Sequence, residues 1–298
     1  MPSPGSDPAP SVSSLLLAAV AMLTRSSESP RLDAEVLLAH VLGGPRSHLH
    51  AWPEKILESG TARAFADLVA QRANGTPVAY LTGVREFFSL PLEVDPAVLI
   101  PRPETELLVE LTLERVPANA ALRILDAGTG SGAIALAIAG ARPRCQVAAS
   151  DISSAALAVA ARNADRFAPG RLALVAGDWL APFAAQSFDV IVSNPPYVPE
   201  ADPHLECGDV RAEPRGALAA GADGLDAIRT VARQARHCLR AGGWLIIEHG
   251  HDQSAAVAQI LERHGARNPE TARDLAGRPR AACAQWTPSC FRTDRMRD

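Results

Sequence analysis

An asparagine, two prolines and a tyrosine follow an apolar stretch in "SNPPYVPE", residues 193–200. The preceding "FDVIV" is typical of a buried strand, which must end at Asn194 because proline cannot donate to a sheet ladder. A residue before a proline is also kept out of the helical region, so this backbone is stiff. The turn is therefore either a rigid exit from a strand or a device that holds one carboxamide and adjacent carbonyls at a fixed angle.

A second candidate site lies in "ILDAGTGSGAIALAIA", where Gly128, Gly130 and Gly132 separate a β-type run from a helix. Glycines there allow a tight turn and bring backbone N–H groups close to a ligand. The spacing also satisfies the loose dinucleotide fingerprint, so the loop alone does not separate NAD from other nucleoside ligands. Asp151 ends the next strand. Its distance along the chain from the glycine loop is close to the roughly 20 residues at which an acidic side chain accepts hydrogen bonds from ribose hydroxyls.

Asp178 and Trp179 follow "LALVAG", where a third strand is expected to end. The acid is suited to accept a hydrogen bond from an adenine amino group, and the indole to pack on its ring. The alternative is a surface acid beside a core tryptophan. Since ligands of open α/β sheets bind at the carboxyl ends of strands, we expect these two residues, Asn194, Asp151 and the glycine loop to meet at one edge.

Alternating strand and helix patterns supply the elements that must hold these residues. Such alternation predicts a parallel, doubly wound sheet flanked by helices. The expected strands are "LRILDAG", "QVAASD", "LALVAGD", "FDVIVSN" and "WLIIEHG"; the expected helices begin at Glu104 and cover residues 132–140, 153–167, 225–241 and 254–264.

The residues before the expected sheet show helical patterns without intervening strands. Residues 11–80 read as helices, for example "SPRLDAEVLLAHVLGGP", which has a proline near its start and a Gly-Gly-Pro stop. Its histidines, His40, His48 and His50, have no companion ligands, and we predict no metal site. "FFSLPLEV" has the character of a β-hairpin, and "AVLIP" reads as a short strand that ends at its proline.

Composition excludes several classes of protein. The 298 residues are 47% hydrophobic and 21% charged, as expected for a globular protein with a sizeable core. A net charge of −4 gives no overall attraction to nucleic acid. Five scattered cysteines without a C-x-x-C pair suggest neither a zinc site nor a disulfide framework, and "LLLAAVAML" is too short to span a bilayer. We therefore expect a cytoplasmic protein.

With these motifs in order, the chain resembles the class I S-adenosylmethionine-dependent methyltransferases, and more closely the HemK/PrmC-type release factor glutamine methyltransferases. The resemblance extends from about Leu15 to Trp286. Its most specific parts are the helical front end, the "IPRPETE" connector and the "EHG" strand, because Asn-Pro-Pro-Tyr also occurs in adenine methyltransferases. It rests on "PVAYLTGVREFF", "VLIPRPETELLVE", "LDAGTGSGAIALA", "ASDIS", "GDWL", "VSNPPYV", "DPHLECGDVRAEPRGAL" and "LIIEHG".

The resemblance implies a seven-stranded Rossmann-like sheet with a small N-terminal helical bundle, joined by a β-hairpin connector. The substrate would be the glutamine of the Gly-Gly-Gln loop of class 1 peptide chain release factors, methylated on its side-chain nitrogen (N5). The chain then divides into a disordered start at 1–10, a helical substrate-recognition domain at 11–80, a connector at 81–101, an S-adenosylmethionine-binding catalytic domain at 102–286 and a tail at 287–298.

The resemblance also implies roles for single residues. The glycine loop would cradle the methionine part of S-adenosylmethionine through Gly128, Thr129, Gly130, Ser131 and Gly132, and Asp151 would hold its ribose. Trp179 would lie by the adenine, where Asp178 is also expected from its place at a strand end. The substrate amide would be held by Asn194, Pro195, Pro196 and Tyr197, and Asn194 is expected to contact the cofactor as well. An amide nitrogen is a poor nucleophile. Two oxygen acceptors, on the Asn194 side chain and the Pro195 carbonyl, would turn it toward the methyl group, while Tyr197 packs beside it.

Three other functions compete with this one. An adenine-N6 DNA or RNA methyltransferase shares the Asn194–Tyr197 turn but should carry a basic groove, which the charge and the first 80 residues do not suggest. Another protein or small-molecule N-methyltransferase remains an alternative. A non-catalytic cofactor-binding scaffold would not need the turn. We expect a monomer without direct contact to nucleic acid or membrane.

Overall fold

The computed structural model describes residues 9–286. The predicted tail at 287–298 and residues 1–8 of the predicted start lie outside this range. Contacts divide the described residues into two compact units, one of residues 9–83 with 206–212 and one of residues 84–205 with 213–286. The helical first unit runs to Gly83 and also takes in residues 206–212, a segment that the division expected from the sequence did not include.

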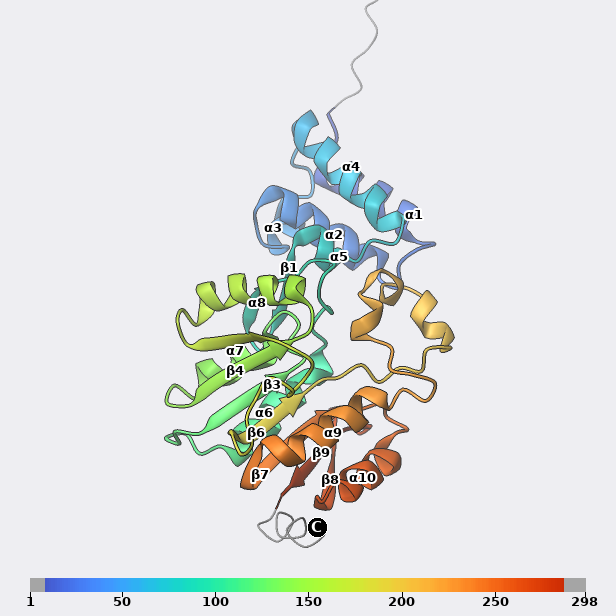
Figure 1. Cartoon of the computed structure of the whole chain (residues 1–298). Helices are drawn as coiled ribbons and strands as arrows, with labels where there is room; N and C mark the ends of the chain where they lie inside the picture. Colours follow the sequence, from blue (N-terminus) through green and yellow to red (C-terminus); the bar gives the residue numbers. More distant parts are fainter. Residues whose placement is uncertain (1–8, 287–298) are drawn as a thin grey trace, which may run out of the picture. The chain divides into compact units, whose positions relative to one another are not determined.

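The first unit is a bundle of helices around its own core (Figure 1). Ser11 caps the first helix by accepting a hydrogen bond from the Ser14 amide, and Pro30 begins the second, where a missing N–H costs nothing. Leu16, Leu38 and Phe65 are fully buried between the helices. The helices are α1 (Val12–Leu23), α2 (Pro30–Leu42), α3 (Ser47–Ala51), α4 (Ser59–Ala73) and α5 (Val78–Thr82).

The second unit begins with the predicted hairpin, β1 (Val84–Phe87) and β2 (Leu90–Glu93), which pair antiparallel. The two turn residues, Phe88 and Ser89, both have positive φ, as the type I′ turn of a two-residue hairpin requires. The expected strand at "AVLIP" is wrong: residues 97–101 form the end of a turn followed by an irregular loop. Prolines punctuate this stretch, and the Ile100 amide donates to the buried Glu213 carboxylate at 3.1 Å instead of to a neighbouring strand.

Seven strands form the sheet, in the order β5-β4-β3-β6-β7-β9-β8. The first five in that order are parallel, as predicted, but β9 runs antiparallel to both of its neighbours. A short connection joins β8 to β9, and only antiparallel neighbours can be joined so tightly. The strands are β3 (Arg123–Ala127), β4 (Gln146–Asp151), β5 (Leu172–Ala176), β6 (Phe188–Ser193), β7 (Leu239–Glu248), β8 (Arg267–Arg273) and β9 (Pro279–Gln285).

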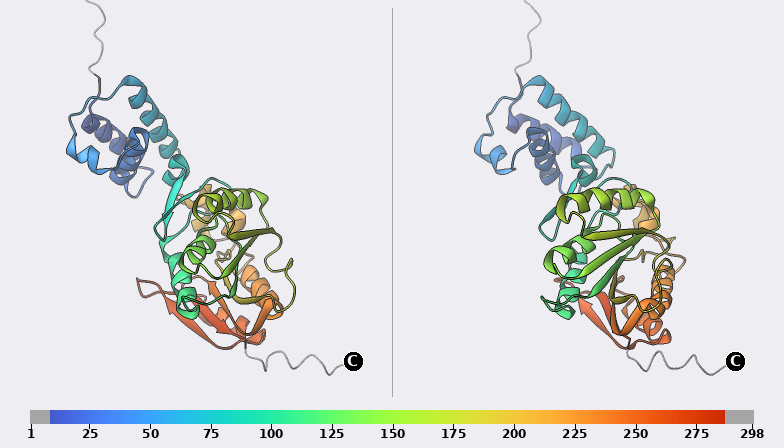
Figure 2. Two further views of the ribbon diagram at one scale, coloured as in Figure 1. Left: turned by 90° about the vertical axis from the view of Figure 1, so that its left-hand side faces the viewer. Right: turned by 60° about the vertical axis from the view of Figure 1, so that its left-hand side comes forward.

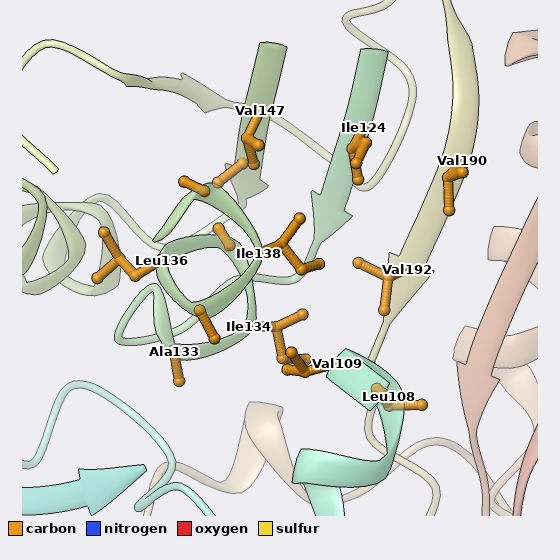
Figure 3. Close-up of a cluster of buried hydrophobic side chains, with 14 of the residues drawn as sticks. Leu108, Val109, Ile124, Ala133, Ile134, Leu136, Ile138, Val147, Val190 and Val192 are labelled. Carbon is orange, nitrogen blue, oxygen red and sulfur yellow. The ribbon is translucent and has the colours of Figure 1, made fainter. Parts of the chain in front are cut away.

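Helices cover both faces of this sheet (Figure 2). On one face, the side chains of Ile124, Val190 and Val192 point toward α6 and α7, where Leu108 and Ile138 meet them (Figure 3). On the other face, alternate strand residues pack against α9 and α10. The helices are α6 (Glu106–Arg115), preceded by the short 3₁₀ turn η1 (Pro103–Thr105), and α7 (Ala133–Ala141), α8 (Ser154–Phe167), α9 (Asp226–Cys238) and α10 (Ser254–Arg263).

One helix ends earlier than its sequence pattern predicts. α9 stops at Cys238 instead of Ala241, and Leu239 already belongs to β7, where it pairs with Phe188. Pairing with a neighbouring strand outweighs the local helical preference there. Among residues 9–286, no helix has the length and apolar character needed to cross a membrane.

Register brings the carboxyl ends of five strands to one level. Ala127 pairs with Ser150, Asp151 with Ala176, and Ser193 with Ile247. The chain order reverses between β3 and β6, which opens a crevice beyond their ends. Residues that directly follow these strands therefore face a common space.

Candidate active site

A cavity of about 290 Å³ occupies this space, entirely within the second unit. Nine of the residues singled out from the sequence line it: Gly128, Thr129, Gly130, Ser131, Asp151, Asp178, Trp179, Asn194 and Pro196. The other three, Gly132, Pro195 and Tyr197, do not line it. Gly132 is the N-cap residue of α7 and is buried, and Pro195 is buried in the turn.

The glycine loop approaches the cavity with its backbone. Gly130 has a φ of +55°, and a Cβ atom there would meet nothing within 4 Å, so the absent side chain leaves open space beside the lining. Below the loop, the Thr129 hydroxyl donates to the buried Asp126 at 2.6 Å. Burial raises the pKa of Asp126 to about 7, and this fully enclosed carboxyl fixes the loop from the sheet side.

Asp151 is held by two backbone amides. Its Oδ2 accepts from Gly130 at 2.9 Å, and its Oδ1 accepts from Ser153 at 2.9 Å. A carboxylate oxygen accepts more than one hydrogen bond, so each oxygen retains capacity toward the cavity. The arrangement suits a ligand that offers two neighbouring hydroxyls. Ile152, next in the chain, is 77% exposed and also lines the cavity.

Trp179 packs directly on the glycine loop. A Cβ at Gly128 would lie 2.6 Å from the Trp179 ring, so only glycine permits this contact. Trp179 itself has a φ of +52°, which costs energy in any residue except glycine. Ser150 compensates by donating its hydroxyl to the Trp179 carbonyl at 2.9 Å. Asp178 is exposed at the rim, so the pair presents an acceptor and an aromatic face together.

Asn194 is oriented by Thr105, a residue that sequence reasoning missed. The Asn194 Nδ2 donates to the Thr105 hydroxyl at 3.1 Å, which leaves the Oδ1 of the amide as the acceptor available to a ligand. Thr105 is buried and lines the cavity at the start of α6. The only sequence signal for it was its place in "IPRPETE".

Tyr197 does not line the cavity and hydrogen-bonds to a buried carboxylate. Its hydroxyl donates to Glu248 at 3.1 Å, and the phenol is largely enclosed. Burial and the neighbouring carboxylate raise the pKa of Tyr197, so the phenol stays protonated and acts as a donor. The tyrosine therefore anchors the turn to the end of β7.

The connector forms the remaining wall. Arg102 lines the cavity and pairs with Glu213, whose carboxylate is fully buried. Residues far along the chain complete this side, since Pro214, Gly216 and Ala217 also line the cavity. None of these was selected from the sequence, because an arginine or proline in a connector has no distinctive spacing. Among residues 9–286, no group of histidine, cysteine and acidic side chains has the arrangement of a metal site.

Two family models match the chain. The PrmC N-terminal domain matches residues 14–83, and the methyltransferase small domain matches residues 104–209. The first corresponds to the helical unit, and the second covers the glycine loop, Asp151 and the Asn194 turn.

Curated relatives match nearly the whole chain. The release factor glutamine methyltransferase of Salmonella typhimurium is 48% identical over 264 residues, which are 89% of this chain and 95% of the relative. That of Vibrio cholerae is 49% identical over 280 residues, 92% of this chain and 96% of the relative. A solved methyltransferase from Pyrococcus furiosus, 18% identical, shares the fold with a TM-score of 0.51 over 74% of this chain and 99% of its own.

Proposed function

The chain belongs to the release factor glutamine methyltransferases, and from this premise we propose that it transfers a methyl group from S-adenosylmethionine to the side-chain amide nitrogen (N5) of a release factor glutamine. The acceptor is the glutamine of the Gly-Gly-Gln loop of class 1 release factors. The observation that carries the proposal is the meeting of the glycine loop, Asp151 and the amide oxygen of Asn194 around one cavity.

The lining residues fit S-adenosylmethionine. When bound, this cofactor supplies a methyl group on a positively charged sulfur. Gly130 leaves open space beside the cavity where another residue would place a Cβ, and Asp151 offers free acceptor capacity to ribose hydroxyls. Trp179 offers an aromatic face, and Asp178 a carboxylate, to an adenine. Thr129 and Ser131 complete the loop.

The Asn194 turn holds the substrate amide. The Oδ1 of Asn194 and the backbone carbonyl of Pro195 each accept one N–H of the glutamine side chain. Both acceptors would favour the positive charge that develops on the nitrogen as its bond to the methyl carbon forms and the bond from that carbon to the cofactor sulfur breaks. The nitrogen would then give up one of its N–H protons to leave a neutral methylated amide. Because prolines stiffen the turn, little reorganisation would be needed to hold the amide for the transfer. Pro196 packs at the cavity wall, and Tyr197 fixes the end of the turn.

The proposed partner determines where the enzyme acts. Class 1 release factors work with ribosomes, so we place the enzyme in the cytoplasm. We propose that it acts as a monomer and reads the protein loop without direct contact to nucleic acid, because its net charge is −4 and the cavity is complete within one chain.

The decisive experiment is transfer of a labelled methyl group to a purified class 1 release factor. Label should appear on the wild-type factor and be absent from a variant whose loop glutamine is replaced by alanine. Double-stranded and single-stranded DNA with adenine serve as alternative acceptors. The proposal would be contradicted if the DNA were labelled, or if the wild-type release factor and its alanine variant were labelled equally.

A further inference from the structure

Proline stiffness fixes only the first part of the Asn194–Tyr197 turn. A proline locks its own φ, and a residue that precedes a proline is kept in the extended region, so Asn194 and Pro195 are both restricted. Pro196 and Tyr197 precede no proline. Their ψ angles are therefore free to change unless another part of the chain holds the far end of the turn.

The side-chain amide of Gln253 holds that far end. Gln253 lies directly before α10, a few residues after the end of β7, and is half-buried. Its Nε2 donates to the Tyr197 carbonyl at 3.0 Å and to the Asp223 carbonyl at 3.3 Å. Its Oε1 accepts from the Gly250 amide at 2.8 Å. One side chain therefore joins three stretches of the second unit: the turn, the loop before α9 and the loop after β7.

The polarity of these three hydrogen bonds requires an amide. The Gly250 N–H group can only donate, and the carbonyls of Tyr197 and Asp223 can only accept. A glutamate of the same shape would set a carboxylate oxygen against the carbonyl oxygens, and a methionine of similar length would leave all three groups without their partner. The polarity at position 253 can therefore be changed while the size of the side chain stays nearly the same.

Gly224, in the loop before α9, makes room for the anchored carbonyl. Its φ is +72°, and a Cβ there would lie 2.2 Å from the Tyr197 carbonyl oxygen and 3.0 Å from the Gln253 Nε2. Since unbonded heavy atoms prefer to be about 3.5–4.0 Å apart, only glycine lets the carbonyl and the amide meet here. Next along the chain, the Val198 amide donates to the Leu218 carbonyl at 2.9 Å. The loop before α9 thus packs closely on the far end of the turn.

We propose that Gln253 is a positioning residue for methyl transfer: it holds the Tyr197 carbonyl and so fixes the direction in which Asn194 and Pro195 present their oxygen atoms. The inference rests on the proposed function, because those two oxygens matter only to a substrate that donates N–H groups. Gln253 does not line the cavity, so it acts through the turn and not on the substrate. Without its amide, the far end of the turn can rotate, and the two acceptors no longer keep one direction.

Loss of this anchor should lower turnover without weakening the cofactor. Gln253→Met removes the three hydrogen bonds, and kcat should fall about tenfold, since a small displacement of an aligned group is costly. The fall is limited because the Tyr197 hydroxyl still donates to Glu248 at 3.1 Å. Gln253→Glu at about pH 8, where a glutamate is ionised, repels the carbonyls and should lower kcat further than the methionine variant does. Cofactor affinity measured by calorimetry should stay within about twofold, because sites that share no partner are nearly independent.

Gln285→Glu is the matched control for the change of polarity. Gln285 on β9 donates its Nε2 to the Gly242 carbonyl at 2.9 Å, so the same substitution sets a carboxylate against a carbonyl there. Gly242 lies in the first half of β7, whereas the cavity lies beyond the carboxyl ends of the strands. This variant should keep the wild-type kcat. All rates are expressed per cofactor-binding site titrated by calorimetry, so that a loss of folded protein is not counted as a loss of turnover.

A double-mutant comparison separates positioning from general destabilisation. If Gln253 works by directing the Asn194 oxygen, its loss should matter less where that oxygen is already gone. In the Asn194→Ala background, Gln253→Met should therefore lower kcat by less than about threefold, against about tenfold in the wild type, because the effects of groups that act together are not additive. An equal loss in both backgrounds would show that Gln253 does not act through Asn194.

Two glycines test the same contact from the other side. Gly224→Ala places a methyl group against the Tyr197 carbonyl, and kcat should fall about tenfold. Gly221→Ala is the control, because its φ of +71° imposes the same backbone strain. The atoms nearest to its Cβ would belong to the exposed side chain of Asp226, which can turn away. Its kcat should stay within about twofold of the wild type.

The outcomes separate this inference from the proposed function. If the wild-type enzyme fails to label the release factor, both are wrong. If it labels the factor but the two Gln253 variants keep the wild-type kcat, or lose no more than Gln285→Glu, the positioning role alone is wrong. Should the Gln253 variants fail to fold, the two glycine variants decide: equal kcat values in Gly224→Ala and Gly221→Ala would overturn the inference.

Discussion

Single residues at this site work through oxygen atoms whose direction is fixed. Asp151 has one backbone amide on each carboxylate oxygen, and Asn194 has its nitrogen held by Thr105. In both cases the fixed bond leaves acceptor capacity aimed at the cavity. An acceptor that needs no rotation before it binds loses less conformational entropy on binding.

At Asn194 the prediction concerns turnover. Asn194→Ala removes one preorganised acceptor, so kcat should fall about 10²-fold or more while cofactor binding persists. Steady-state labelling of the release factor, with calorimetry for the cofactor, measures the two effects separately. A rate near that of the wild type would mean that the amide oxygen has no part in the reaction.

At Asp151 the prediction concerns affinity. Asp151→Ala should weaken cofactor binding by about 1.5–3 kcal/mol, the usual size for hydrogen bonds to a charged group. Isothermal titration calorimetry provides the measurement. Asp165→Ala, at an acid on the exposed side of α8, is the control and should leave affinity unchanged. Equal affinity in the Asp151 variant and the wild type would remove this carboxylate from the site.

At the scale of elements, the turns after β3 and β6 do the positioning. The first is built from glycines with positive φ, and the second from prolines that end a strand. The hairpin of β1 and β2 forms as its sequence suggests, whereas residues 97–101 do not form a strand because Ile100 bonds to Glu213. A local sequence pattern therefore predicts a strand well only where the backbone amides are not hydrogen-bonded to a side chain from a distant part of the sequence.

Two glycines, Gly130 in the loop before α7 and Gly140 within α7, allow the effect of backbone strain in the loop to be measured apart from the effect of helix stability. Gly130→Ala places a side chain at a φ of +55°, which costs about 1–2 kcal/mol in the left-handed region, and it should weaken cofactor binding. Gly140→Ala lies in α7 with open space around it and should stabilise the protein by about 0.5–1 kcal/mol without affecting the cofactor. Urea unfolding and calorimetry distinguish them. Identical cofactor affinity in both variants would show that the loop conformation is unimportant.

At the scale of the whole molecule, the chain forms two units, and the first takes in a segment from far along the sequence. Arg72 on α4 is 6% exposed and donates to Asp33 on α2 at 2.7 Å. It also donates to Asp209, which lies in the segment 206–212 of the same unit. Ser27 donates to Asp33 at 2.7 Å, so the buried charges are hydrogen-bonded as well as paired.

Removal of this arginine should loosen the first unit. Arg72→Met leaves the buried Asp33 carboxylate without its cation and should cost about 3–5 kcal/mol of that unit's stability. It also frees residues 206–212, so trypsin should cleave faster after Arg211. Arg63→Met, exposed on the same helix, is the control and should change neither quantity. An unchanged cleavage rate in the Arg72 variant would show that the arginine does not hold the segment.

The sequence by itself determined the five parallel strands of the sheet and nine residues of its cavity, because strand ends follow from apolar patterns and parallel pairing brings those ends level. Tertiary structure alone decided which partners those residues meet. Asn194 and Thr105 are 89 residues apart, and Tyr197 and Glu248 are 51 apart. Such contacts depend on how elements pack in space, which the spacing of residues within one motif does not encode. For this reason the sequence did not predict that Tyr197 hydrogen-bonds to a buried carboxylate.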